Sequence, residues 1–185
     1  MRSNPKRSSK IDPISFQGAL ISADRDRMEE MQNEFMRRAI ELAVESAESN
    51  GGGPFGAVII SGGEIVAEGT NQVAVVNDPT AHAEVVAIRR ACARLQNFQL
   101  SECEIYSSCE PCPMCLGAIY WARIRAIHFA ASADDAAQAG FADRAFYDQL
   151  RLSRDKRAVP MRQLLREQGL EAFKVWERKA DKIQY

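Results

Sequence analysis

The chain has 185 residues, of which 46% are hydrophobic and 26% are charged, as in an average single-domain globular protein and unlike a disordered chain. Its 24 Lys and Arg nearly balance 25 Asp and Glu, but residues 11–150 carry ten basic and twenty acidic side chains, whereas residues 151–185 carry ten and five. The acidic body argues against a polyanion binder, and no apolar run reaches the ~18 residues of a membrane span. The basic N-terminus lacks the apolar core of a secretory signal, so we expect a cytoplasmic protein that contacts no membrane.

The first part of the chain divides into a leader, a helix and a hairpin. Residues 1–25 contain Pro, Ser and Gly without sustained periodicity, and we expect a poorly ordered basic leader ahead of one domain, residues 26–185. From Met28 to Ser49 the apolar residues follow the 3.6-residue period of an amphipathic helix, which the glycines at 51–53 end. Residues 55–61 and 64–69 flank Gly62-Gly63, which predicts a hairpin of two short strands.

The middle of the chain alternates helices with strands. We expect a helix from the Asp78-Pro79-Thr80 segment to about residue 95, a strand at 105–107, a helix at 112–123 and a strand at 126–130. This alternation predicts an α/β sandwich in which helices cross between parallel strands. Beyond residue 131 we expect a helix at 145–152, a strand near 159–164 and a terminal helix around 170–180.

A cysteine cluster in the second half predicts a metal site. Four of the five cysteines lie within 13 residues, and in a reducing cytoplasm such clusters favour metal binding or catalysis over disulfides. Cys112 and Cys115 form a C-x-x-C pair at a helix start, and with His82 they make a ligand set that suits one Zn²⁺ with an open fourth position, as in catalytic sites. Cys109 is the alternative fourth ligand of a closed structural site, but it ends a strand, whereas Cys112 and Cys115 share a helical face.

Glu84 has a different place in this pattern. It follows His82 by two residues, a rotation of about 200° on a helix, so the two side chains do not approach a metal together as ligands. Glu84 can instead flank a water on the metal. The order H-x-E followed by P-C-x-x-C is the pattern of zinc deaminases, in which the Glu shuttles protons. The alternative is an acid stabilised by a helix N-terminus.

Two long segments resemble the cytidine-deaminase-like superfamily: PTAHAEVVAIRRAC at 79–92 and YSSCEPCPMCLGAIYWARIRA at 106–126. Shorter motifs are similar to its purine-acting branch, the bacterial guanine deaminases: GPFGAV at 53–58, Asn71 ahead of DPTAH, DAAQAGF at 135–141 and the final Tyr185. The resemblance runs from about Met28 to Tyr185. It implies a three-layer α/β/α sandwich with a central mixed sheet.

The same resemblance implies a reaction and a set of roles. The reaction is hydrolytic deamination of guanine to xanthine and ammonia, with zinc held by His82, Cys112 and Cys115. Glu84 would be the catalytic proton shuttle, and Asp143 a second catalytic carboxylate that contacts the base, although the family's Gly-Phe-Asp-Asp is Gly-Phe-Ala-Asp here. The residues implied to contact the purine are Asn71, Phe55, Ala83, Trp121 and Tyr185.

The resemblance also implies a homodimer whose exchanged C-terminal segment closes the partner's site as a lid. The alternatives with the same zinc core are a guanosine deaminase and a tRNA adenosine deaminase; a structural zinc module that binds a partner belongs to another class. The acidic residues 11–150 argue against a nucleic-acid substrate, whereas the basic C-terminal region leaves tRNA as an alternative. Three of these residues also have a purely structural interpretation: Asn71 as a turn residue, Trp121 as a core residue and Asp143 as the N-cap of a helix. We expect His128 to be structural or on the surface.

Overall fold

The computed structural model of the chain describes residues 13–49, 52–141 and 143–184, with side chains from residue 25 onward. Its centre is a four-stranded sheet of order β2-β1-β3-β4, formed by β1 (Gly56–Ser61), β2 (Glu64–Thr70), β3 (Cys103–Cys109) and β4 (Ala126–Ala131). Strand β1 pairs antiparallel with β2 and β3, while β3 and β4 pair in parallel. The predicted mixed sheet is therefore confirmed.

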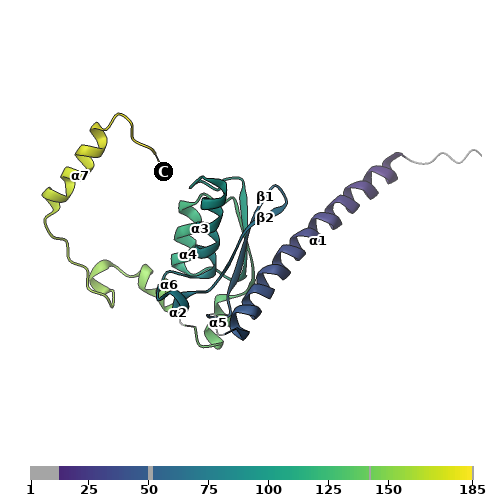
Figure 1. The fold of residues 1–185 in the computed structure, drawn as a ribbon, viewed down its shortest axis with the longest axis horizontal. Coiled ribbons are helices and arrows are strands. Elements are labelled where there is room, and N and C mark those ends of the chain that lie inside the picture. Colours follow the sequence, from purple (N-terminus) through teal and green to yellow (C-terminus); the bar gives the residue numbers. More distant parts are fainter. Residues whose placement is uncertain (1–12, 50–51, 142, 185) are drawn as a thin grey trace, which may run out of the picture.

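Helices cover both faces of this sheet (Figure 1). Helix α1 (Pro13–Glu48) lies on one face, and α3 (Ala83–Leu95) and α4 (Pro113–Trp121) lie on the other. The chain also forms α2 (Val73–Val76), α5 (Ala133–Gln138), α6 (Asp143–Arg151), α7 (Arg166–Arg178) and a 3₁₀ turn at Arg154–Lys156. Because side chains alternate along a strand, Val58 and Ile60 of β1 pack toward α1, whereas Ala57 and Ile59 pack toward α3 and α4. This is the expected three-layer α/β/α sandwich.

Two glycines let the helices lie directly on the strands. A Cβ at Gly69 of β2 would lie 2.6 Å from the backbone N of Ala87 in α3, and closer still to the carbonyl O of Ala83. A Cβ at Gly56 of β1 would lie 2.7 Å from the backbone N of Ala43 in α1. The start of α3, where the metal-site sequence begins, is thus set by backbone contact with the sheet.

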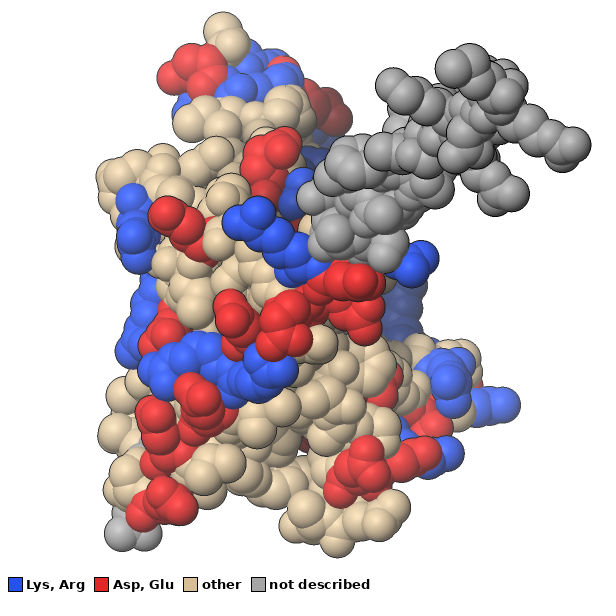
Figure 2. Space-filling view, turned by 90° about the vertical axis from the view of Figure 1, so that its right-hand side faces the viewer, with Lys and Arg blue, Asp and Glu red and all other residues tan. Residues whose placement is uncertain are grey.

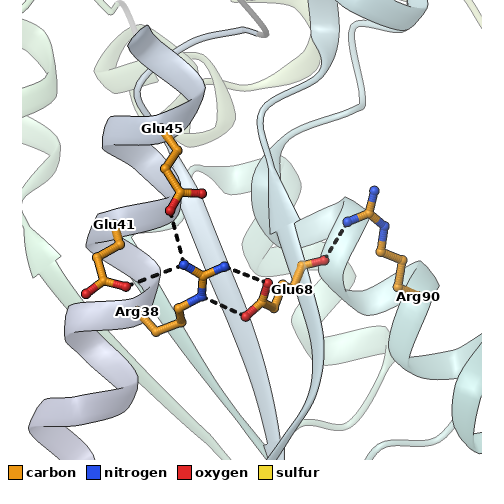
Figure 3. Close-up of polar contacts among 5 residues, drawn as sticks. All are labelled: Arg38, Glu41, Glu45, Glu68 and Arg90. Atoms are coloured by element: carbon orange, nitrogen blue, oxygen red, sulfur yellow. Dashed lines mark hydrogen bonds and ion pairs between the residues drawn. The ribbon is translucent and has the colours of Figure 1, made fainter. Parts of the chain in front are cut away.

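Charged side chains fasten the outer layers to the edge strand β2 (Figure 3). Arg38 of α1 donates two hydrogen bonds to the Glu68 carboxylate, at 2.8 and 3.0 Å, and also contacts Glu41 and Glu45. Arg90 of α3 donates to the Glu68 carbonyl at 2.9 Å. On the face shown in Figure 2, basic side chains lie among acidic ones rather than in a continuous basic patch, which is unlike a polyanion-binding surface.

Several element boundaries differ from the sequence predictions. Helix α1 starts at Pro13 rather than Met28, since proline suits the first turn of a helix; residues 1–12 of the expected leader lie outside the described residues. Helix α3 begins after His82 rather than at Asp78, because the Asp78 carboxylate accepts hydrogen bonds from the N–H and hydroxyl of Thr80 and forms a turn there.

The C-terminal third departs most from prediction. The strand expected near 159–164 is wrong: the segment pairs with no strand of the described chain, and Val159 and Leu164 are exposed. Helix α5 was not predicted, although Ser132 and Asp135 form a capping box at its start. Helix α7 confirms the terminal helix but lies apart from the sheet (Figure 1), with Trp176 and other apolar side chains exposed. No helix of the described chain combines the length and apolarity needed to span a bilayer.

Candidate metal centre and active site

The starts of α3 and α4 bring three metal-ligating side chains together. His82 caps α3 and Cys112 caps α4, where Pro113 occupies the first turn. The His82 Nδ1 atom lies 3.7 Å from Cys112 Sγ and 3.6 Å from Cys115 Sγ, and the two sulfurs are 3.6 Å apart. Tetrahedral zinc with Zn–S of about 2.3 Å and Zn–N of about 2.0–2.1 Å requires separations of about 3.8 Å between sulfurs and about 3.6 Å between N and S. The three predicted ligands therefore fit a zinc ion.

Cys109 does not belong to this ligand group. Its Sγ donates to the Ser132 carbonyl O, 3.6 Å away, and among the described residues the group that can hold a metal consists of His82, Cys112 and Cys115. Burial, followed by the charge of Glu84, raises the pKa of the Cys109 thiol to about 11, so this side chain stays protonated. The residues that the structure describes therefore do not form a closed four-ligand structural site.

The ligand group already holds negative charge for a cation. The hydrogen bond between the Cys112 and Cys115 sulfurs lowers the pKa of Cys112 to about 4, against the opposing effect of burial, and the hydrogen bond with His82 lowers it further. That same shared proton, together with burial, raises the pKa of Cys115. Cys112 is thus a thiolate at neutral pH, placed at a helix N-terminus that favours it. A metal ion would displace the remaining proton from Cys115.

A cavity of about 300 Å³ opens beside these ligands. It brings together the two predicted carboxylates, Glu84 and Asp143, with Phe55 and Asn71. Glu84 is only 6% exposed, and its burial raises the pKa of its carboxyl group. Burial also raises the pKa of Asp143, and the Cys112 charge adds to the shift. Two carboxyl groups that hold protons more readily than usual therefore face one cavity beside the metal ligands.

The polar and aromatic walls of the cavity come from neighbouring turns. Asn71 is buried, and its Oδ1 accepts the Val73 N–H at 3.2 Å, so the turn role and the cavity role coexist. Gly52, at φ +148°, lies against the Asn71 backbone, where no side chain would fit. The rings of Phe55 and Phe141 meet edge to face with centroids 4.8 Å apart. The cavity therefore offers an amide and an aromatic wall.

Two residues that the sequence placed against the purine, Ala83 and Trp121, do not have their side chains in this cavity. The Ala83 side chain is fully buried in the core, which leaves its backbone N–H in the first turn of α3 as the available group. Trp121 is 68% exposed and lines a separate groove with Phe98, because it ends α4 about 9 Å along the axis from Cys115. Tyr185 lies outside the described residues.

The structure adds cavity residues that the sequence did not single out. They include Glu110 and Phe141; Cys109, which the sequence offered only as a metal ligand, also lines the cavity. The sequence could have identified Phe141 as a cavity residue, since it stands two residues before Asp143, whereas no sequence feature pointed to Glu110. His128 has the structural role expected of it: its Nε2 lies 3.1 Å from Glu104, and its ring stacks on Tyr106.

Comparison with known proteins places this geometry among zinc deaminases. The family model of the cytidine and deoxycytidylate deaminase zinc-binding region matches residues 29–131. The chain is 50% identical over 151 residues to a guanine deaminase of Bacillus subtilis, a match that covers 82% of this chain and 97% of the relative. A tRNA-specific adenosine deaminase of Haemophilus influenzae is 43% identical over 56% of this chain and 60% of its own length.

Solved structures that share this fold include guanine deaminases. The crystal structure of the Bacillus subtilis guanine deaminase has a TM-score of 0.81 at 50% identity, with 83% of this chain and 98% of that chain covered. A guanine deaminase of Nitrosomonas europaea has a TM-score of 0.56 at 32% identity, with 75% and 70% covered. Another structure, 32% identical with a TM-score of 0.57 over 75% of this chain and 70% of that chain, holds 8-azaguanine.

Proposed function

This chain belongs to the cytidine and deoxycytidylate deaminase family of zinc-binding proteins, and we propose that it hydrolyses guanine to xanthine and ammonia. The observation that carries the proposal is one cavity of about 300 Å³ in which buried Glu84 and Asp143 lie beside three residues that fit zinc. The extensive identity to a guanine deaminase supports guanine as the base.

Glu84 is the proposed proton carrier. His82, Cys112 and Cys115 would hold zinc, which when bound would lower the pKa of a water molecule and so supply a nucleophile near neutral pH. Glu84 accepts a proton from that water as a C–O bond forms at C2 of guanine, and it passes this proton to the ring nitrogen. It then takes the second proton from the added hydroxyl and gives it to the leaving amine. The C2–N bond then breaks and ammonia leaves. Burial moves the Glu84 pKa toward the working pH, which suits a group that must both take and return a proton.

Asp143 is the proposed reader of the base. Any aminated heterocycle can meet a zinc-activated water, so selectivity must come from the walls of the cavity. The Asp143 carboxylate accepts N–H groups of guanine, whereas adenine presents a lone pair at N1 and would leave that carboxylate without a donor. Leaving such a group unpaired supports strong discrimination. The rings of Phe55 and Phe141 supply the apolar wall.

A free base is the proposed substrate in preference to a nucleoside or tRNA. The acidic body repels a phosphate backbone. The tRNA-specific relative matches about half of this chain, whereas the guanine deaminase matches most of it. The basic residues 151–185 are the feature that favours RNA, and a substrate panel tests that alternative.

We also propose that residues 26–185 form one functional unit in a cytoplasmic homodimer, with the C-terminal segment of each copy covering the partner's cavity. Within one chain, Leu164, Phe173 and Ile183 are exposed although apolar. Tyr185, at the end of this segment, would then reach the partner's cavity. Sedimentation of the full chain should show a dimer, and a chain ending at residue 160 should turn over guanine poorly while it keeps its zinc. A monomeric full chain would overturn this part of the proposal.

A panel of guanine, guanosine, adenine, cytosine and cytidine, together with an adenosine-34 tRNA stem-loop, tests the substrate assignment by ammonia release. We expect guanine to have the highest kcat/KM. A higher value for guanosine or for the stem-loop would overturn the free-base assignment.

A further inference from the structure

The side chain proposed to read the base stands on a thinly packed segment. Helix α6 starts with Asp143, which lines the cavity, and it packs against α5. We call these two helices the cover. Helix α6 has no buried residue, and its apolar side chains Phe146 and Leu150 are more than half exposed. The hydrophobic core therefore does not fix the place of Asp143, and polar contacts must contribute.

Two hydrogen bonds join this cover to the loop that carries Cys112. At the start of α5, the backbone N–H of Ala133 donates to Glu110 Oε2 at 3.0 Å. In α6, the Tyr147 hydroxyl donates to the carbonyl O of Pro111 at 2.8 Å. The accepting residues directly precede Cys112, so each bond ties the cover to the metal ligands rather than to a distant part of the fold.

Tyr147 is placed to act on Asp143 without touching the substrate. The two residues are four apart in α6 and so lie on the same face, about one turn from each other. Tyr147 is not among the residues that line the catalytic cavity; with Glu110 and Ala133 it lines a second, adjoining groove. Burial raises the pKa of its phenol, which keeps the hydroxyl protonated and able to donate.

We propose that Tyr147 is a positioning residue: its hydrogen bond to the Pro111 carbonyl holds α6 so that Asp143 faces the base beside the zinc ligands. This inference rests on the proposed function, in which Asp143 contacts the guanine base. Pro111 directly precedes the metal ligand Cys112. The Tyr147 hydrogen bond therefore links the helix that carries Asp143 to the loop that carries a zinc ligand. Small displacements of such a group weaken binding because a hydrogen bond depends steeply on geometry.

The test is a double-mutant cycle on binding, so it needs no turnover. The affinity for 8-azaguanine is measured by calorimetry on the zinc-loaded full chain for wild type, Tyr147→Phe, Asp143→Asn and the double variant. Tyr147→Phe removes only the hydroxyl. We expect it to weaken binding about 3- to 10-fold in the wild-type background and to change it less than about 2-fold in the Asp143→Asn background. Tyr120→Phe, on a side chain 74% exposed in α4, is the matched control and should leave binding unchanged.

Zinc content and guanine turnover separate the possible failures. We expect each variant to keep one zinc per chain. Equal weakening by Tyr147→Phe in both backgrounds, unchanged binding, or loss of zinc from Tyr147→Phe would each overturn the positioning role. If wild type releases no xanthine from guanine, the proposed function fails instead, and the cycle still reports whether Tyr147 acts through Asp143 on a bound purine.

Discussion

Replacing Gly69 with alanine should damage the zinc site from the far side of α3. The new Cβ would lie 2.6 Å from the backbone N of Ala87 and 3.1 Å from its Cβ, and closer still to the carbonyl O of Ala83. The blocking atoms are nearly all backbone, so no side-chain rotation relieves them. Restoring ordinary contact distances requires α3 to move from β2 by about 1 Å.

That displacement is large for the metal site. His82 and Glu84 stand at the start of α3, and the Nδ1–Sγ separations of 3.6 and 3.7 Å fit zinc as they are. Metal ligands tolerate deviations of about 0.2 Å, and a 1 Å misplacement can cost about 10²-fold in rate. We expect Gly69→Ala to lower the free energy of unfolding by about 1–3 kcal/mol, to weaken zinc binding and to lower kcat on guanine about 10²-fold.

Gly117→Ala is the matched control. It lies in α4, close in sequence to Cys115, but its Cβ would meet nothing within 4 Å. It should keep zinc and activity and raise the free energy of unfolding by about 0.5–1 kcal/mol. Denaturant titration, zinc analysis and guanine turnover on both variants give the comparison. Wild-type zinc affinity and turnover in Gly69→Ala would refute the claim that backbone contact with β2 sets the place of the ligands.

Two further predictions concern the proton carrier Glu84 and the ion pair between Arg38 and Glu68. Glu84→Gln should keep one zinc per chain and lose about 10²–10⁴-fold in kcat, because an amide cannot carry the proton; ammonia release within tenfold of wild type would contradict that role. Glu68→Gln removes a carboxyl whose pKa the Arg38 hydrogen bonds lower, so the stabilisation is present above the ordinary pKa of 4.5 and is lost as pH falls through the lower folded value. Because the Glu68 side chain is 35% exposed, the variant should be only about 0.5–1 kcal/mol less stable than wild type at pH 7. Denaturant titrations should show this difference shrinking below pH 4.5. A difference that does not depend on pH would contradict a stabilising Arg38–Glu68 ion pair.

Local patterns were sufficient to predict the hairpin, helices α3 and α4 and the metal ligands, whereas the mixed sheet was expected from the family resemblance. The hairpin at Gly62-Gly63, the strands before and after α4, and the His82, Cys112 and Cys115 group were predicted from spacing alone and are found in the structure. These features depend on residues close in sequence, or on two helix starts that follow β2 and β3, which run in the same direction on either side of β1. Glu84 was also expected beside the ligands and outside the ligand group, as observed.

The features that the sequence did not predict depend on tertiary contacts. The alternation at 159–164 suits a strand, but strand formation also needs a neighbouring edge, and this segment takes none within the described chain. Trp121 was assigned to the cavity by motif, yet its helix carries it to another surface. Glu110 and Tyr147 became visible only when α5 and α6 were seen to bond to the loop before Cys112.

The most direct test of the account is to follow guanine with the full chain before and after zinc is removed. The account predicts one xanthine and one ammonia per guanine from protein that holds one zinc per chain, loss of both products when a chelator strips the metal, and their return when zinc is restored. Protein that holds one zinc per chain and forms no xanthine from guanine would contradict it.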